Sequence, residues 1–335
     1  MNTEIVYSKT FNRHDNPNHP ENAKRTDVMM DALLNSDLRN HVKIIDPIIL
    51  PEDSLLSVHD VEMVFQIKAM SKLTEAWVDP DTYVCRHDFD TARLAAGGMV
   101  QLCNDVSSGL IDNGFALVRP PGHHATKNRS MGFCLFNNVS VAAKELIKNG
   151  KRVLIFDSDV HHGNGTQDIF YDSEKVLYQS FHLSPHFPGT GAIDEIGTKK
   201  GEGYTVNAPL PHKTGEKTIQ QMMDEIFKPI AKQFKPDIIL VSSGYDTHYS
   251  DQLGGLHVGI DYFGEMIRQL QEIQPKIVLT IEGGYNLDII GNCFLSQISR
   301  LCDKPMFFED NVPSSIETPL VVKTLKENLK PYWDL

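Results

Sequence analysis

Short apolar runs recur through the middle and C-terminal half of the chain and alternate with segments of helical periodicity. The predicted strands are Gly114–Val118, Arg152–Phe156, Val176–Phe181, Asp237–Val241 and Ile277–Ile281, and the predicted helices are Val139–Lys148, Thr218–Gln233 and Tyr262–Gln274. Strands that are apolar throughout, rather than at every second residue, are typical of a parallel sheet covered on both faces. We therefore expect a three-layer α/β fold, with a central, mostly parallel sheet between two layers of helices.

Polar, ionisable and glycine-rich residues follow four of these strands directly. GFALV runs into RPPGHH, RVLIF into DSDVHHGNG, DIILV into SSGYD, and IVLTI into EGGYN. Right-handed crossovers bring the carboxyl ends of parallel strands to one edge of the sheet. Open α/β sheets bind their ligands in the crevice outside that edge. The four segments are therefore predicted to meet in one pocket.

The composition limits the class of protein. No repeat, low-complexity tract or linker divides the 335 residues, so we expect one domain over residues 1–335. A net charge of −12 argues against direct nucleic-acid binding, which needs a basic surface. The N-terminus lacks a basic and apolar leader pattern, and no apolar run approaches roughly 18 residues. We expect a soluble, cytoplasmic protein that does not insert into membranes; an oligomer is compatible with the sequence.

The five cysteines do not suggest a disulfide framework. Their number is odd, they are widely spaced, and no two form a CxxC pair; they are Cys85, Cys103, Cys134, Cys293 and Cys302. This pattern also argues against a zinc site made of thiolates, so we expect reduced thiols.

Asp157, Asp159 and His161 alternate along the chain after the second of the four strands. In an extended backbone, side chains two residues apart point the same way, so Asp159 and His161 could bind one ion from a single strand end. Asp246 could reach the same ion from a neighbouring strand. These ligands suit catalytic zinc, which keeps a fourth position for water; iron(II), cobalt or manganese could also use them. The alternative is that the aspartates cap turns or helices and the histidine is structural.

Two adjacent histidines, His123 and His124, follow a Pro-Pro-Gly turn that could direct both toward one site. Beside a metal-bound water, one imidazole could act as a general base and the other could stabilise charge. Each needs a partner on its other ring nitrogen, and Asp157 and Asn164 are the candidates. Tyr285, in a Gly-Gly-Tyr turn, could donate its hydroxyl to a developing oxyanion.

Six segments in a fixed order resemble the histone deacetylase family, within the arginase/deacetylase fold. They are RPPGHHA (119–125), GFCLFNNVSVAA (132–143), FDSDVHHGNGTQ (156–167), FPGTGAIDEIG (187–197), GYDTHYSDQLGG (244–255) and EGGYN (282–286). The resemblance extends from about residue 14 to residue 286. The motif sequences RPPGHHA and HHGNGTQ resemble those of the class II branch and its bacterial and archaeal relatives.

The resemblance implies a role for each candidate residue. The zinc ligands are the two aspartates and one histidine named above. His124 matches the general base that later acts as the general acid, and His123 matches the protonated histidine that stabilises the oxyanion. Asp157 and Asn164 match their respective partners, and Tyr285 matches the tyrosine that polarises the carbonyl. Class I members usually carry Asp where Asn164 stands. A neutral Asn should give His124 a lower pKa than an Asp would.

Further residues match the substrate tunnel and a second ion. The tunnel walls and rim correspond to Gly132, Phe133, Phe187 and Leu253, although the two phenylalanines could instead be core residues. The family's structural potassium site corresponds to Asp157, Asp159, His161, Ser180 and Phe181. Two other histidines, His14 and His19, are candidates for a loop at the pocket rim.

The implied reaction is zinc-dependent hydrolysis of acetyl or other acyl groups from lysine side chains of peptides or proteins, or from related acylated amines, with release of acetate. An acetylpolyamine or other small-molecule amidohydrolase is the main alternative, although Leu253 stands where one known polyamine-selective gatekeeper is acidic. A manganese-dependent ureohydrolase would need more carboxylates after His161, and HHGNG supplies none. A non-catalytic acetyl-lysine binder would be expected to lack a metal ligand or the tyrosine.

Overall fold

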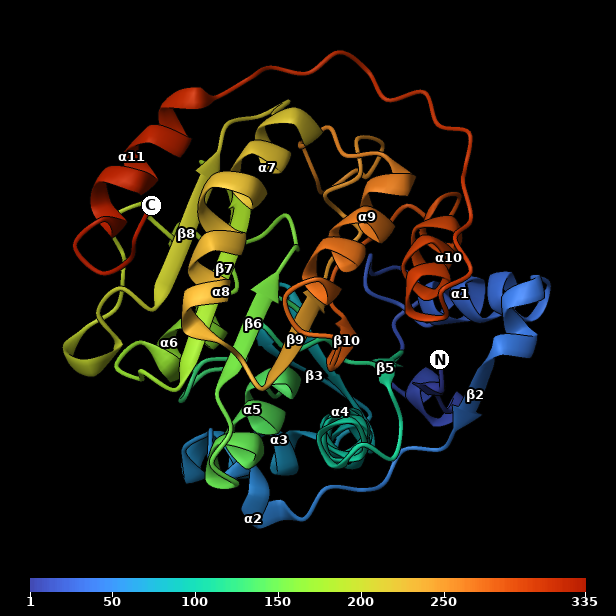
Figure 1. The fold of residues 1–335 in the computed structure, drawn as a ribbon. Coiled ribbons are helices and arrows are strands. Elements are labelled where there is room, and N and C mark those ends of the chain that lie inside the picture. Colours follow the sequence, from blue (N-terminus) through green and yellow to red (C-terminus); the bar gives the residue numbers. More distant parts are fainter.

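The computed structural model describes residues 1–335 and contains an eight-stranded sheet in which all neighbouring strands are parallel. In spatial order the strands are β2 (Val42–Ile45), β1 (Thr3–Val6), β5 (Asn113–Ala116), β10 (Ile277–Ile281), β9 (Ile238–Ser243), β6 (Val153–Asp157), β7 (Val176–Leu183) and β8 (Thr205–Leu210). Helices surround this sheet (Figure 1), which confirms the predicted α/β architecture. A separate antiparallel hairpin consists of β3 (Glu75–Asp79) and β4 (Thr82–Cys85).

Each face of the sheet packs against its own group of helices. One group comprises α1 (Lys24–Leu34), α7 (Glu216–Met222), α8 (Lys228–Phe234), α9 (Ile260–Gln271), α10 (Ile290–Leu301) and α11 (Pro319–Leu329). The other comprises α2 (Glu52–Leu55), α3 (Val61–Met70), α4 (Asp88–Ser108), α5 (Asn138–Lys148) and α6 (Asn164–Phe170). Within β6, Leu154 belongs to the first core and Ile155 to the second, which explains why the strand is apolar throughout.

The structure contains all five predicted strands, and β10 has the predicted bounds. β7 begins at the predicted Val176, and the other predicted strand ends shift by one or two residues. Strands β1, β2 and β8 were not predicted. Their sequences, TEIV, VKII and TVNAPL, are short or interrupted by polar residues and proline, so they lack the continuous apolar signal of the inner strands.

The helix predicted over Thr218–Gln233 is interrupted. Between α7 and α8 lies a π-helical turn, Met223–Phe227, in which the N–H of Lys228 donates to the carbonyl of Met223, five residues earlier. Pro229 follows this turn and has no N–H to donate. Its ring would also clash with the carbonyl four residues earlier, so the wider turn accommodates the proline without ending the helix.

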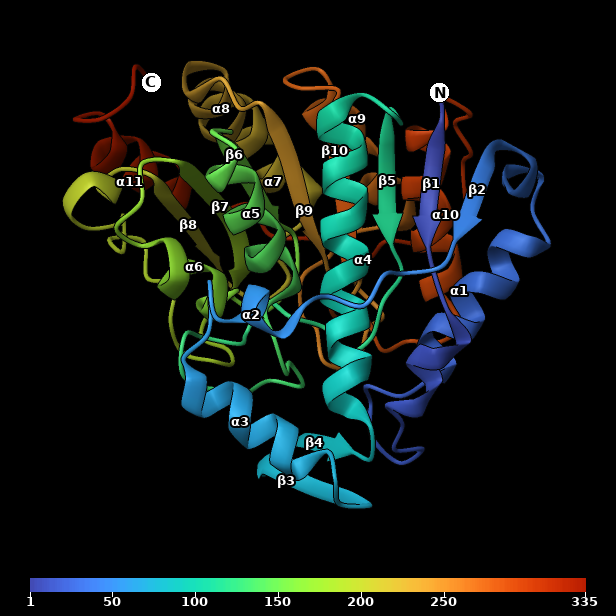
Figure 2. The ribbon, with the colours of Figure 1, turned by 90° about the horizontal axis from the view of Figure 1, so that it is seen from below.

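The predicted functional segments lie at the carboxyl edge of the sheet. Figure 2 shows the arrows of β1, β2 and β5 pointing to this edge, with the β3–β4 hairpin beyond it. All five cysteines are unpaired, and Cys85 is the least buried of them. No helix combines the length and the hydropathy needed to cross a bilayer.

Candidate active site

Asp159, His161 and Asp246 lie together beyond the carboxyl ends of β6 and β9, with one ligand atom of each within 4.8 Å of the others. Nδ1 of His161 is 3.0 Å from Oδ1 of Asp159 and 3.3 Å from Oδ2 of Asp246. The expected extended backbone is wrong in one respect, because β6 ends at Asp157 and the chain then bends. In this bend Asp159 accepts a hydrogen bond from the backbone N–H of His161. The bend, rather than strand alternation, brings the two side chains together.

This cluster fits a divalent cation. All three side chains are buried, and Oδ2 of Asp246 has no hydrogen-bond partner. A buried carboxylate oxygen without a partner is costly unless a cation neutralises it. Burial alone would lower the pKa of His161, but the two carboxylates outweigh burial and raise it to about 10. The cluster therefore strongly favours a positive charge, and two carboxylates with one imidazole are donors that zinc accepts.

His123 and His124 lie in the turn after β5, with ring centres 4.0 Å apart. The two predicted partners are in place. Nδ1 of His123 is 3.1 Å from Oδ2 of Asp157, and Nδ1 of His124 is 2.8 Å from Oδ1 of Asn164. Each partner fixes the orientation of its ring, as an outer-shell group does in metal enzymes.

The two histidines have opposite pKa shifts. Burial would lower the pKa of His123, but Asp157 and Asp159 outweigh burial and raise it to about 10. Burial lowers the pKa of His124 well below its usual value, and the positive charges of His123 and His161 add to this. The shifts favour an imidazolium at His123 and a neutral imidazole at His124. One ring can stabilise negative charge while the other can accept a proton.

A buried carboxylate that the sequence analysis did not single out holds this turn. Oε2 of Glu282 accepts hydrogen bonds from the backbone N–H groups of Gly122, at 2.7 Å, and His123, at 3.1 Å. Its Oε1 accepts from the hydroxyl of Ser242 at 2.9 Å. The segment EGGYN was interpreted through its glycines and tyrosine, because the role of the Glu depends on backbone groups that only the tertiary structure brings near.

Tyr285 follows β10 and is held by its neighbours. Its N–H donates to Oδ2 of Asp251 at 2.6 Å. The guanidinium of Arg25 lies 4.8 Å from the centre of its ring and donates to the carbonyls of Gly284 and Glu282, both at 2.6 Å. Burial raises the pKa of the phenol well above its usual value, so its hydroxyl stays protonated and can donate.

These groups open onto a cavity of about 310 Å³. The cavity is lined by Asp81, His124, Gly132, Phe133, His161, His186, Phe187, Gln252, Leu253, Gly254 and Tyr285. All four predicted tunnel residues are among them. Asp81, His186, Gln252 and Gly254 were not predicted. Asp81 comes from the tip of the β3–β4 hairpin, and its position depends on how that hairpin folds over the sheet edge.

The backbone at Gly132 keeps the cavity open. Gly132 has φ of 55° and Phe133 has φ of 67°, a left-handed conformation that an L side chain rarely adopts. A Cβ atom at Gly132 would lie 2.5 Å from the ring of His124 and 3.0 Å from that of Phe187. Glycine is therefore needed here both for backbone conformation and for space.

The residues of the expected potassium site also lie near one another. Asp157 and Ser180 are paired in register on β6 and β7, and Phe181 follows on β7. Oδ1 of Asp157 accepts the backbone N–H of Asp159 at 3.2 Å. Of the two rim candidates, the ring of His19 is 4.5 Å from that of Phe133, whereas His14 is fully buried away from the cavity.

Comparison with known proteins places this geometry in a family. Residues 19–301 match the histone deacetylase domain. A probable deacetylase from Archaeoglobus fulgidus is 38% identical over 86% of this chain and 82% of its own length. The histone deacetylase HDA1 of Saccharomyces cerevisiae is 34% identical over 84% of this chain but only 43% of its own length. The chain thus spans less than half of that longer relative.

A solved structure supports the same family assignment. The crystal structure of the HDA15 HD domain superposes with a TM-score of 0.92 and 34% identity, over 99% of this chain and 95% of that one. The match covers the central sheet and the segments that form the cavity. This chain therefore belongs to the histone deacetylase family of hydrolases, which act on acetylated substrates, are generally metal-dependent and share the arginase/deacetylase fold.

Proposed function

We propose that this chain is a zinc-dependent deacetylase that hydrolyses acetyl or other acyl groups from lysine side chains of peptides and proteins, or from related acylated amines. The observation that carries the proposal is the buried cluster of Asp159, His161 and Asp246 beside the cavity that His124 and Tyr285 line. These three side chains would hold the zinc ion. When bound, the ion supplies Lewis-acid polarisation of the acyl carbonyl and lowers the pKa of a water molecule.

His124 is the general base in this proposal. Its Nδ1 faces the carbonyl oxygen of Asn164 and carries the ring proton, so Nε2 is free to accept one from the attacking water. The lowered pKa of His124 keeps the ring neutral until the water attacks. The same Nε2 then returns the proton to the departing amine, and the products are acetate and a free amine.

His123 and Tyr285 stabilise the oxyanion in this proposal. His123 keeps its Nδ1–H on Asp157, and its raised pKa leaves a second N–H for the developing negative charge. The phenol of Tyr285 donates from a backbone held by Asp251 and Arg25. These donors are fixed before reaction, so little reorganisation is needed in the transition state.

The shape of the cavity favours an extended acyl-lysine side chain. Gly132, Phe133, Phe187 and Leu253 would enclose the aliphatic stem. Leu253 is uncharged, so it offers nothing to the second ammonium group of a polyamine. A small acylated amine remains the alternative substrate.

The proposal includes several secondary features. A potassium ion would bind near Asp157, Asp159, His161, Ser180 and Phe181. It would stabilise the segment after β6 that carries two of the proposed zinc ligands. Residues 1–335 would act as one catalytic domain, since β1 and β10 belong to one sheet. A cytoplasmic location is supported by the five unpaired cysteines.

Turnover of zinc-loaded and zinc-stripped protein tests the proposal. Three substrate classes are compared: acetyl-lysine peptides, longer acyl-lysine peptides and acetylpolyamines. We expect kcat/KM to be highest for the acetyl-lysine peptides. Activity should vanish on zinc removal and return on zinc addition. A preference for acetylpolyamines would favour the alternative, and zinc binding without turnover of any of these substrates would indicate a non-catalytic binder.

A further inference from the structure

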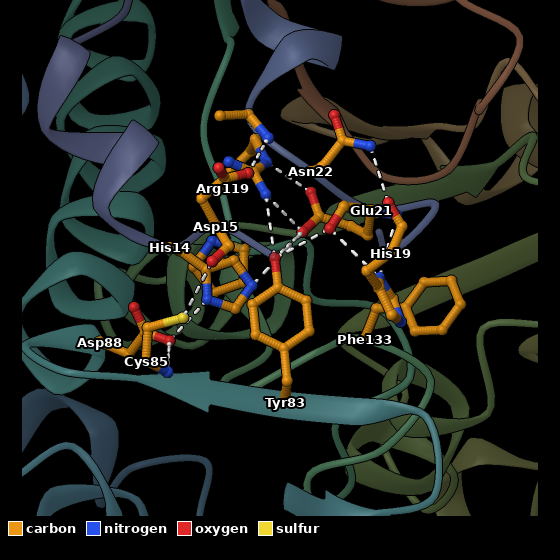
Figure 3. A network of polar contacts seen from close by, with 12 residues as sticks. His14, Asp15, His19, Glu21, Asn22, Tyr83, Cys85, Asp88, Arg119 and Phe133 are labelled. Atoms are coloured by element: carbon orange, nitrogen blue, oxygen red, sulfur yellow. Dashed lines mark hydrogen bonds and ion pairs between the residues drawn. The ribbon is translucent and has the colours of Figure 1, made fainter. Parts of the chain in front are cut away.

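A second cluster of metal-ligating side chains lies outside the active site. His14 follows the short 3₁₀ helix Lys9–Arg13, Cys85 ends β4, and Asp88 begins α4. One ligand atom of each lies within 4.8 Å of the others. None of the three lines the cavity. Figure 3 shows these side chains converging at one end of a buried polar network.

The ring of His14 lies between two buried carboxylates. Nδ1 of His14 is 2.6 Å from Oδ2 of Asp88, while its Nε2 is 3.3 Å from Oε2 of Glu21. A carboxylate facing the second ring nitrogen is the usual outer-shell partner of a metal-bound histidine. Oδ1 of Asp88 is buried and has no hydrogen-bond partner. An ion would supply the missing interaction.

The charges of the surrounding network leave Asp88 in need of a cation. Glu21 is already compensated, because Arg119 donates to both of its carboxylate oxygens and Arg25 donates to Oε1. Asp88 has no arginine or lysine partner; its Oδ2 contacts His14 and accepts a hydrogen bond from the backbone N–H of Cys85 at 2.6 Å. An ion at this cluster would supply the positive charge that the arginines supply to Glu21.

We propose that His14, Cys85 and Asp88 form a second, structural site for a thiophilic divalent cation such as zinc. The carbonyl oxygen of Asp15, 3.4 Å from the sulfur of Cys85, is the candidate fourth donor. Mixed nitrogen, sulfur and oxygen donors suit zinc or cobalt and are poor ligands for magnesium or calcium. With a single thiolate among its ligands, this site differs from the zinc site made of thiolates that the cysteine spacing argues against.

The distances and the charge balance are compatible with such an ion. Zinc bonds of about 2.0–2.3 Å place tetrahedral ligand atoms roughly 3–4 Å apart, so the contact of His14 with Asp88 would widen by about 1 Å. Zinc binds thiolate and neutral imidazole, so binding would displace the thiol proton of Cys85 and the second ring proton of His14. A divalent cation that replaces two protons leaves the net charge of the buried network unchanged.

The ion would join the N-terminal segment to the end of the β3–β4 hairpin and the start of α4. His14 belongs to the N-terminal segment that continues to His19, whose ring contacts that of Phe133. Cys85 anchors the hairpin that carries Asp81 into the cavity lining. Asp88 ties both to the long helix α4. The role of the ion is therefore to hold the hairpin and the N-terminal segment in place, not to take part in the reaction.

Cobalt titration of the metal-stripped full chain tests this site directly. The ligands proposed for the active site include no sulfur, so a thiolate-to-cobalt charge-transfer band cannot arise there. We expect two bound Co²⁺ ions per chain and such a band. Cys85→Ser should abolish the band and lower the stoichiometry to one, whereas the control Cys302→Ser should retain both ions and the band.

A variant of the active site separates this inference from the proposed function. Asp246→Asn should remove one ion while the charge-transfer band persists. If the unmodified chain binds a single ion without a band, or if the band survives in Cys85→Ser, the second site is refuted. Both readouts are independent of turnover, and the unmodified chain decides the matter even where a variant folds poorly.

Discussion

Two buried charged regions of this molecule differ in the cationic side chains that face their carboxylates. The catalytic cluster (Asp159, His161 and Asp246) holds two carboxylates close to one imidazole, and Oδ2 of Asp246 has no hydrogen-bond partner. In the N-terminal network (His14, Glu21, Arg25, Asp88 and Arg119), two arginines pair with Glu21, while Asp88 pairs with His14 and keeps one oxygen without a hydrogen bond. Both regions lie near the carboxyl edge of the sheet, and both are nearly inaccessible to solvent.

The difference indicates that the catalytic cluster serves mainly to bind a cation, whereas the N-terminal network serves mainly to stabilise the fold. Crowded carboxylates destabilise the metal-free catalytic cluster, and burial together with Asp159 raises the pKa of Asp246 to about 6. A bound cation removes the repulsion between the carboxylates, so the free energy that this repulsion costs adds to the affinity for the cation. In the N-terminal network the bidentate pair between Arg119 and Glu21 already satisfies both partners. Substitution of the catalytic aspartates should therefore affect metal binding, and substitution of Glu21 should affect folding.

The largest effect is expected for Asp246→Asn. Loss of a ligand removes the ion and with it several kcal/mol of transition-state stabilisation, so kcat/KM should fall on the order of 10⁴-fold. In the presence of a chelator, this variant should be at least as stable to urea as the parent, because one of two crowded carboxylates is gone. Metal analysis and urea unfolding check both points, with the exposed Asp288→Asn as a control. A large loss of metal-free stability would contradict the comparison.

Glu21→Gln should show the opposite pattern. The variant leaves Arg119 and Arg25 buried without their carboxylate, which costs about 3–5 kcal/mol of unfolding free energy. The metal content of the catalytic cluster should be retained in the folded fraction. The matched control is Glu52→Gln, which breaks the surface pair with Lys68 and should cost less than about 1 kcal/mol. Equal urea midpoints for the two variants would show that the network is not a major source of stability.

Tyr285→Phe should separate metal binding from chemistry within the site. Removing one oxyanion donor should lower kcat by about 10²–10³-fold while the ion stays bound. Tyr245→Phe serves as the control, because its hydroxyl bonds to Gln297 at 2.8 Å and does not line the cavity. Metal analysis beside steady-state kinetics checks the prediction. Zinc loss, or full activity, would count against the assigned role of Tyr285.

The smallest expected effect is that of Asn164→Asp. A carboxylate beside His124 favours its protonated form and raises its pKa, by roughly one unit. Since His124 must be neutral to accept a proton, the acid limb of the kcat/KM profile should move to higher pH by a similar amount. The measurement is a pH–rate profile of both proteins at full zinc occupancy. An unchanged acid limb would mean that another group controls it.

The inner part of the fold could be predicted because its strands carry their own signal. IVLTI in β10 and RVLIF before the bend are buried on both faces, so almost every residue is apolar. The outer strands β1, β2 and β8 were missed because they are short or contain polar residues and proline, and their pairing depends on neighbours distant in sequence. The π turn before Pro229 was missed because helical periodicity does not reveal a local change of hydrogen bonding.

In the candidate active site, too, residues in compact sequence motifs could be predicted and residues that act over long sequence distances could not. Groups expected to touch the metal or substrate lie in compact motifs, and the structure brings them together. Glu282 and Arg25 act on backbone atoms of other segments, and Asp81 reaches the cavity from a hairpin outside the sheet. No local pattern distinguishes such residues from ordinary surface or core charges. Cys85 illustrates this, because Asp88 follows it closely in the sequence but the third candidate ligand, His14, lies in a distant segment.

The position of β10 has a consequence for synthesis. This strand lies between β5 and β9, so without it the sheet consists of two separate pieces, β2–β1–β5 and β9–β6–β7–β8. On the ribosome, residues 277–281 emerge after all the other strands, and two apolar strand edges stay unpaired until then. Tyr285 follows directly behind. A nascent chain therefore joins the two parts of its sheet and completes its oxyanion site in nearly the same step, after the other strands have emerged.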